Sequence, residues 1–196
     1  MNLLTLIEEI LQEKCIVHLK KTSFSLTESS PGNACEEVKV NVSGPCIVCR
    51  FESIMCCTGT TKVEISPYFN NLSNVKKMCD YIVFYKHKET DNKINVFLCE
   101  LKGTSSYRLQ LKAGYSFARF IIDAAKRYGE SKQFQSNENI EYRGVAFTRT
   151  PFFKHTIDPK RKDYIKVDPA SSKHIEYFEI ECNRIVDSFD LHKHTY

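Results

Sequence analysis

The sequence lacks any apolar stretch approaching the roughly 20 residues that a helix needs to cross a bilayer, so no transmembrane helix is predicted. It also lacks a basic leader and a cleavage site at residues 1–11, where apolar residues recur at helical spacing between acidic ones. We therefore expect a helix there and not a signal peptide. There is no internal repeat and no clear second domain, so residues 1–196 are predicted to form one domain.

Two segments differ in composition from the rest of that domain. Residues 21–45 are rich in Ser, Thr, Gly, Pro and Asn, and we expect an insertion around them. From about residue 151 the chain becomes basic, which predicts a C-terminal elaboration, and the run at 176–182 within it predicts a further strand. The formal net charge of +4 permits nucleic-acid binding without requiring it.

Nine cysteines are many for an intracellular chain, but their odd number argues against the completed disulfide framework of a secreted protein. A reduced, cytoplasmic setting is the simpler expectation. Cys46, Cys49, Cys56 and Cys57 raise the alternative of a zinc site, although the second pair lacks the usual two-residue spacing. Because these cysteines alternate with apolar residues, buried core thiols are favoured over zinc ligands.

Two strand-like segments, residues 79–86 and 94–101, flank a polar stretch centred on Thr90 and predict a β-hairpin. In a hairpin symmetric about Thr90, the numbers of facing residues sum to about 180. Asp80, which opens the first segment, then faces Glu100, which closes the second. Facing residues share one side of the sheet, so the two carboxylates are predicted to lie together.

Lys102 follows Glu100 by two positions and therefore falls on the same side of the predicted sheet. Asp80, Glu100 and Lys102 are expected to form one cluster. The Glu-x-Lys pattern also occurs at 37–39 and 130–132, in polar or helix-terminal surroundings, so the pattern alone carries little weight. An ordinary salt bridge at the end of a strand is the alternative interpretation.

The chemistry of these residue types points to phosphodiester hydrolysis. Two carboxylates supply the hard oxygen ligands that Mg2+ prefers, and a bound Mg2+ can neutralise a phosphate and activate water. The Lys102 ammonium, partly buried beside a metal, would have a lowered pKa and could polarise the water and stabilise the pentacovalent phosphate. Arginine would be a poorer proton acceptor there.

An Asp that opens one strand and a Glu-x-Lys that closes the next resemble the PD-(D/E)XK nuclease superfamily, over roughly residues 75–150. The resemblance implies an α/β (α+β) fold with a restriction-endonuclease-like α-β-β-β-α-β core. Its mixed central sheet would be flanked by helices, with extra strand and helix elements at the C-terminus. Cys79 stands where many members have a proline before the Asp.

The resemblance also implies a metal site. Mg2+, or Mn2+ in its place, would be bound by Asp80, Glu100 and the backbone carbonyl of Leu101, with Lys102 beside the attacking water. Many members have a further acidic residue on the first helix, and either Glu8 or Glu9 could fill that role here.

A long helical pattern follows the predicted hairpin, after turn and capping candidates at residues 103–106. Gln110 lies in its first turns, where the helix should pass the metal site, so it could contact substrate or water; a solvated helix residue is the alternative. RecB-like members have a Tyr four residues after such a Gln, but Gly114 holds that place here. The apolar stripe of the helix comprises Leu111, Tyr115, Ala118, Ile122 and Ala125.

Three basic residues are candidates for nucleic-acid binding. Arg149 closes the strand-like segment at 142–147 and would lie at the same sheet edge as the carboxylates if that strand is parallel to its neighbour. Arg108 and Lys112 are carried by the long helix. Ordinary surface charges that keep the protein solvated are the alternative for each of them.

The function predicted from the sequence is a metal-dependent nuclease that hydrolyses phosphodiester bonds, with DNA favoured and RNA left open. The resemblance suggests a bacterial defence or restriction effector. Two alternatives remain: a catalytically inactive member that binds nucleic acid or protein, and an unrelated α+β interaction protein in which Asp80, Glu100 and Lys102 form an ion-pair network. No membrane partner is expected, whereas a homo-oligomer or a regulatory partner would restrain such a nuclease.

Overall fold

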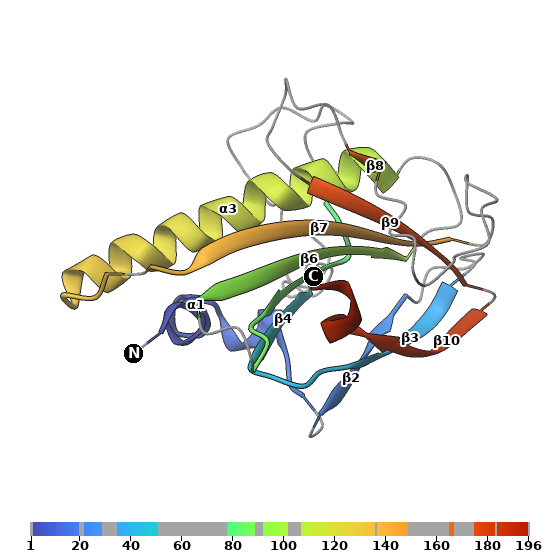
Figure 1. Cartoon of the computed structure of the whole chain (residues 1–196), viewed down its shortest axis with the longest axis horizontal. Coiled ribbons are helices and arrows are strands. Elements are labelled where there is room, and N and C mark those ends of the chain that lie inside the picture. The colour runs from blue at the N-terminus through green and yellow to red at the C-terminus, as the bar shows by residue number, and fades with distance from the viewer. Residues whose placement is uncertain are drawn as a thin grey trace, which may run out of the picture.

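The structure is a computed structural model, and it describes residues 2–19, 22–28, 35–50, 78–88, 92–101, 107–135, 137–148, 165–166, 175–182 and 184–195. These residues form a mixed α/β arrangement with a large mixed sheet, a small second sheet and two α-helices. Figure 1 shows the long helix α3 over one side of the large sheet and the small sheet on the other side.

The large sheet has seven strands in the order β1-β4-β5-β6-β7-β9-β8. From β1 to β6 neighbouring strands are antiparallel, β7 and β9 continue the sheet parallel to β6, and β8 is antiparallel to β9. The strands are β1 (Ile16–Val17), β4 (Cys46–Arg50), β5 (Tyr81–Tyr85), β6 (Lys93–Leu101), β7 (Asn139–Thr148), β8 (Ile165–Lys166) and β9 (Ile175–Glu181).

The predicted pairing of residues 79–86 with 94–101 is confirmed. Strands β5 and β6 are antiparallel neighbours, and Ile82 pairs with Leu98, so that facing numbers sum to 180 as expected. Both strands are buried over nearly their whole length, with side chains packed on both faces of the sheet. A shift of one residue would move every side chain to the opposite face, so this burial specifies the register strongly.

Helices α1 (Leu3–Ile10) and α3 (Tyr107–Ser131) form the layer on one face of the large sheet. The first confirms the helix expected at the N-terminus, where the Asn2 side chain caps it by accepting a hydrogen bond from the Thr5 amide at 2.9 Å. The second joins β6 to the parallel strand β7. Its predicted apolar stripe is buried at Leu111, Ala118, Ile122 and Ala125 and half-buried at Tyr115.

The second sheet has three strands in the order β10-β3-β2, with β10 parallel and β2 antiparallel to β3. The strands are β2 (Ser23–Thr27), β3 (Cys35–Asn41) and β10 (Arg184–Asp190), and short 3-10 helices lie at Glu13–Cys15 (η1) and Leu191–His194 (η2). Its apolar side chains pack with the other face of the large sheet. The segment expected to be an insertion, residues 21–45, therefore supplies two strands of this layer.

A disulfide between Cys35 and Cys182 joins the start of β3 to the residue that follows β9, 147 positions later in the chain. The cysteine count did not predict this bond. A disulfide is typical of an oxidising compartment, whereas the sequence favoured a reduced, cytoplasmic setting. The cytoplasmic location stays a prediction. None of the described helices is long and apolar enough to cross a membrane.

Cys46 and Cys49, the first pair of the zinc alternative, are free thiols on β4. Burial raises the pKa of Cys49 to about 12 and also raises that of Cys46, which favours the neutral thiol over a metal-binding thiolate. Cys56 and Cys57 lie outside the described residues.

Gly114 is where α3 comes closest to the start of β5. A Cβ added at this position would lie 2.3 Å from Cys79 Sγ and 3.4 Å from Cys79 Cβ. There is accordingly no room at position 114 for the Tyr of RecB-like proteins. The close approach brings the first turns of the helix against the segment that carries Asp80.

We expect Gly114→Ala to lower the free energy of unfolding by about 1 to 2 kcal/mol, because overpacking outweighs the gain in helix propensity. Adding Cys79→Ala removes the clashing sulfur. The double variant should therefore lose less unfolding free energy than the two single variants lose together. Urea unfolding of the four proteins gives this coupling. Strictly additive effects would contradict the close approach.

Candidate functional site

The structure brings Asp80 and Glu100 together. Tyr81 pairs with Cys99, and continuing this ladder by one residue places Asp80 opposite Glu100. Their neighbours two positions along, Ile82 and Leu98, belong to the core beneath the helices. Because side chains alternate along a strand, Glu100 on β6 lies on the face that α3 covers, whereas Asp80 directly precedes β5.

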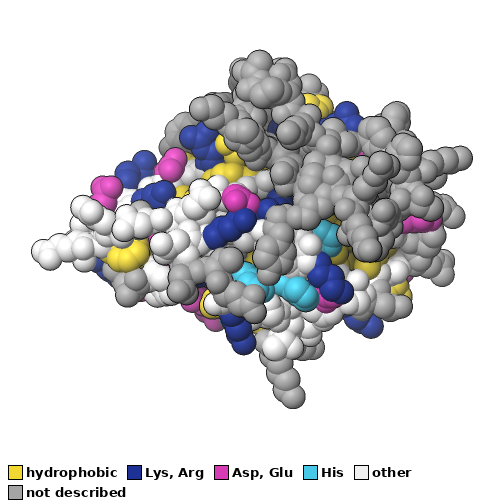
Figure 2. All heavy atoms as spheres, viewed as in Figure 1, with side chains coloured by type: hydrophobic (Ala, Val, Ile, Leu, Met, Phe, Trp, Pro, Cys, Tyr) yellow, Lys and Arg dark blue, Asp and Glu magenta, His cyan; other side chains and the backbone are white. Residues whose placement is uncertain are grey.

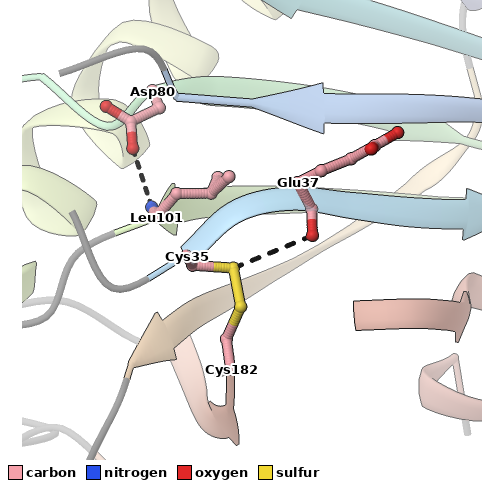
Figure 3. The surroundings of a disulfide bond; sticks show 5 residues. All are labelled: Cys35, Glu37, Asp80, Leu101 and Cys182. Carbon is pink, nitrogen blue, oxygen red and sulfur yellow. Dashed lines mark hydrogen bonds between the residues drawn. A yellow bond between two sulfur atoms is a disulfide. The ribbon is translucent and has the colours of Figure 1, made fainter. Parts of the chain in front are cut away.

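A hydrogen bond fixes Asp80 to the end of β6. The Leu101 amide donates to Asp80 Oδ2 at 2.7 Å, and Figure 3 shows the carboxylate turned toward that amide. The amide and carbonyl of one residue in an extended strand point to the same neighbour. The Leu101 carbonyl, the third predicted ligand, is therefore on the Asp80 side of β6.

The two carboxylates create a negative potential at this end of the sheet. Burial raises the pKa of the Cys79 and Cys99 thiols, and the charges of Glu100 and Asp80 raise both further. The Glu100 side chain is fully buried, whereas Asp80 is half-buried. A buried carboxylate requires hydrogen bonds, a compensating positive charge or a proton.

Gln110 is bonded to the segment that carries Asp80. Its Nε2 donates to the carbonyl of Met78, two residues before Asp80, at 3.3 Å. Its side chain is buried, and no hydrogen-bond partner in the described part of the chain reaches Oε1. The amide oxygen therefore remains available as an acceptor near the carboxylates.

The structure does not bring Glu9 to the site. Glu9 is exposed on α1 and forms an ion pair of 2.6 Å with Lys132, just past the C-terminal end of α3, whereas Gln110 lies in the first turn. A helix of 25 residues is roughly 37 Å long, which separates these two ends. Glu8 is exposed on the same short helix, at the far end of α3 in Figure 1.

The candidate nucleic-acid contacts are only partly described. Arg108 and Lys112 are exposed and lie one turn apart near the start of α3. Figure 2 shows Lys and Arg side chains interspersed with Asp and Glu over the described surface of this face. Lys102 and Arg149 lie outside the described residues, so their roles remain predictions.

Glu179 is a site residue that the sequence reasoning missed. Glu100 pairs with Ala146 on β7, and Ala146 pairs with Glu179 on β9, so the three lie in one row across the parallel strands. Tyr107, the first residue of α3, donates a hydrogen bond from its hydroxyl to Glu179 Oε1. The strand that carries Glu179 was predicted, but nothing in the sequence indicated its register with β7.

Within the described ranges, no group of three or more His, Cys, Asp or Glu side chains is arranged to hold a metal ion. The acidic part of the candidate site is therefore the pair Asp80 and Glu100. No family model, no curated protein and no solved structure matches this chain.

The hydrogen bond between Asp80 and Leu101 predicts a difference between two variants. Asp80→Ala leaves the Leu101 amide without its acceptor and should lower the free energy of unfolding by about 1 to 3 kcal/mol. Asp80→Asn keeps an acceptor oxygen, so we expect a loss of less than about 1 kcal/mol. Equal losses in urea unfolding would show that the carboxylate does not hold the strand end.

Proposed function

We propose that the protein is a metal-dependent nuclease of the PD-(D/E)XK type that hydrolyses phosphodiester bonds, with DNA as the favoured substrate. The observation that carries the proposal is the position of Asp80 next to Glu100 at the ends of adjacent strands, with Asp80 bonded to the Leu101 amide. A role in bacterial defence or restriction rests on the sequence resemblance alone.

The order of elements supports this proposal. Helix α1 comes first, and after β1, β2 and β3 the antiparallel strands β4, β5 and β6 are followed by α3 and the parallel strand β7. Apart from the inserted strands, this order is consistent with the α-β-β-β-α-β core that the resemblance implies. The additional strands are β1 on one side of these strands, β9 and β8 on the other side, and the three strands of the small sheet.

The donor atoms at the site fit Mg2+ or Mn2+. Asp80 and Glu100 supply carboxylate oxygens and Leu101 supplies a carbonyl, and these are the hard ligands that such ions take. The negative potential that raises the pKa of the neighbouring thiols favours a cation at the same place. A bound Mg2+ would neutralise charge on the phosphate and promote ionisation of a water molecule.

The other residues have roles that follow from their positions. The buried Gln110 oxygen can accept a hydrogen bond from the attacking water, and Arg108 and Lys112 can contact the nucleic-acid backbone from the exposed side of α3. Lys102 is proposed to polarise that water and Arg149 to contact a phosphate, both on the basis of sequence position.

A catalytically inactive binding module is the second candidate. It is favoured by one observation, that no third acidic ligand joins Asp80 and Glu100 among the described residues. Such a module would retain nucleic-acid or protein binding and lack cleavage, so activity distinguishes the two candidates.

Purified protein incubated with single- and double-stranded DNA and RNA should cleave DNA in the presence of Mg2+ or Mn2+ and not in EDTA. We expect Asp80→Asn, Glu100→Gln and Lys102→Ala each to lower the rate at least about 100-fold, because each removes a charge from the reacting centre.

Glu130→Gln is the matched control, because it neutralises the exposed Glu of another Glu-x-Lys pattern at the far end of α3. It should cleave at the wild-type rate. Cleavage by Glu100→Gln at the wild-type rate would refute the proposed site, and binding without any cleavage by the wild type would favour the inactive module.

A further inference from the structure

The first turn of α3 lies across a row of four residues on the large sheet. The row begins at Asp80, just before β5, and continues through Glu100 on β6 and Ala146 on β7 to Glu179 on β9. Neighbouring strands are about 4.8 Å apart, so the backbones at Glu100 and Glu179 are roughly 10 Å apart. Ala146, between the two glutamates, is small and fully buried.

Two hydrogen bonds tie this turn to opposite ends of the row. At one end Gln110 donates to the Met78 carbonyl at 3.3 Å, next to the segment that carries Asp80. At the other end the Tyr107 hydroxyl donates to the Glu179 carboxylate on β9. The four residues from Tyr107 to Gln110 therefore bridge the sheet over Glu100.

Tyr107 is suited to a permanent donor role. Its side chain is buried, and burial together with the Glu179 hydrogen bond raises its pKa to about 12, against the opposing effect of Arg108. The hydroxyl therefore keeps its proton at neutral pH and donates to the carboxylate. A carboxylate acceptor makes this hydrogen bond stronger than one between neutral groups.

We propose that Glu179 is a positioning residue of the nuclease site: through the Tyr107 hydroxyl it holds the first turn of α3, and with it Gln110, over the carboxylate pair. This inference rests on the proposed function, and it makes β9 one of the strands that contribute residues to the site.

The position of Gln110 depends on both tethers, but only the Glu179 tether can be removed without altering Gln110 itself. Tyr107→Phe deletes the hydroxyl and keeps the buried ring, and Glu179→Ala deletes the acceptor. Glu179→Gln keeps an oxygen that can still accept the tyrosine proton. These three variants separate the hydrogen bond from the packing and from the charge.

Steady-state kinetics of Mg2+-dependent cleavage test the proposal. We expect Tyr107→Phe and Glu179→Ala each to lower kcat about 10- to 100-fold with little change in KM, because misplacing a group at the reacting centre affects the chemical step. The double variant Tyr107→Phe/Glu179→Ala should be no slower than either single variant. Glu179→Gln should recover most of the wild-type kcat.

Tyr128→Phe is the matched control, since Tyr128 lies on the same helix near its other end and is exposed. It should keep the wild-type kcat. A wild-type kcat for Tyr107→Phe, additive losses in the double variant, or a Glu179→Gln protein as slow as Glu179→Ala would each overturn the positioning role.

These failures are distinguishable from failure of the proposed function. If the wild type cleaves and Asp80→Asn does not, while Tyr107→Phe is unaffected, only the inference about Glu179 is wrong. If the wild type shows no metal-dependent cleavage, the proposed function and this inference fail together.

Discussion

The pairing register of β5 and β6 holds Asp80 opposite Glu100, and the candidate site exists only in that register. Both strands are buried on both faces, between the helices and the small sheet. A slip of one residue would move the apolar side chains of the slipped strand to the opposite face and would separate Asp80 from Glu100. The hydrogen bond from Leu101 to Asp80 then fixes the end of the pair. Core packing and site geometry thus depend on the same alignment.

The layers on the two sides contribute differently to this site. On one face, the lack of a side chain at Gly114 lets α3 approach Cys79. Hydrogen bonds from Gln110 and Tyr107 tie the first turn of α3 to the segment before β5 and to β9. On the other face, Leu101 packs in the same core as the disulfide between Cys35 and Cys182, which Figure 3 shows next to it. The strand ends that carry the carboxylates are therefore supported from both sides.

Local patterns in the sequence were sufficient to predict the central elements. Alternation and a polar turn predicted the β5 and β6 register, and the apolar stripe predicted α3. What could not be predicted depends on contacts between distant segments: the small sheet, the disulfide across 147 positions, and the register that sets Glu179 in line with Glu100. Residue type likewise did not reveal which end of α3 the first helix packs against, so the sequence could not place Glu9, which pairs with Lys132.

Binding of Mn2+ to the purified protein, followed by electron paramagnetic resonance, tests the central claim most directly because it does not depend on finding the substrate. The account predicts that the wild type and Glu130→Gln bind the ion, and that Asp80→Asn and Glu100→Gln do not bind it while remaining folded. Equal binding by Asp80→Asn and the wild type, or no binding by the wild type, would contradict the assignment of this pair as a metal site.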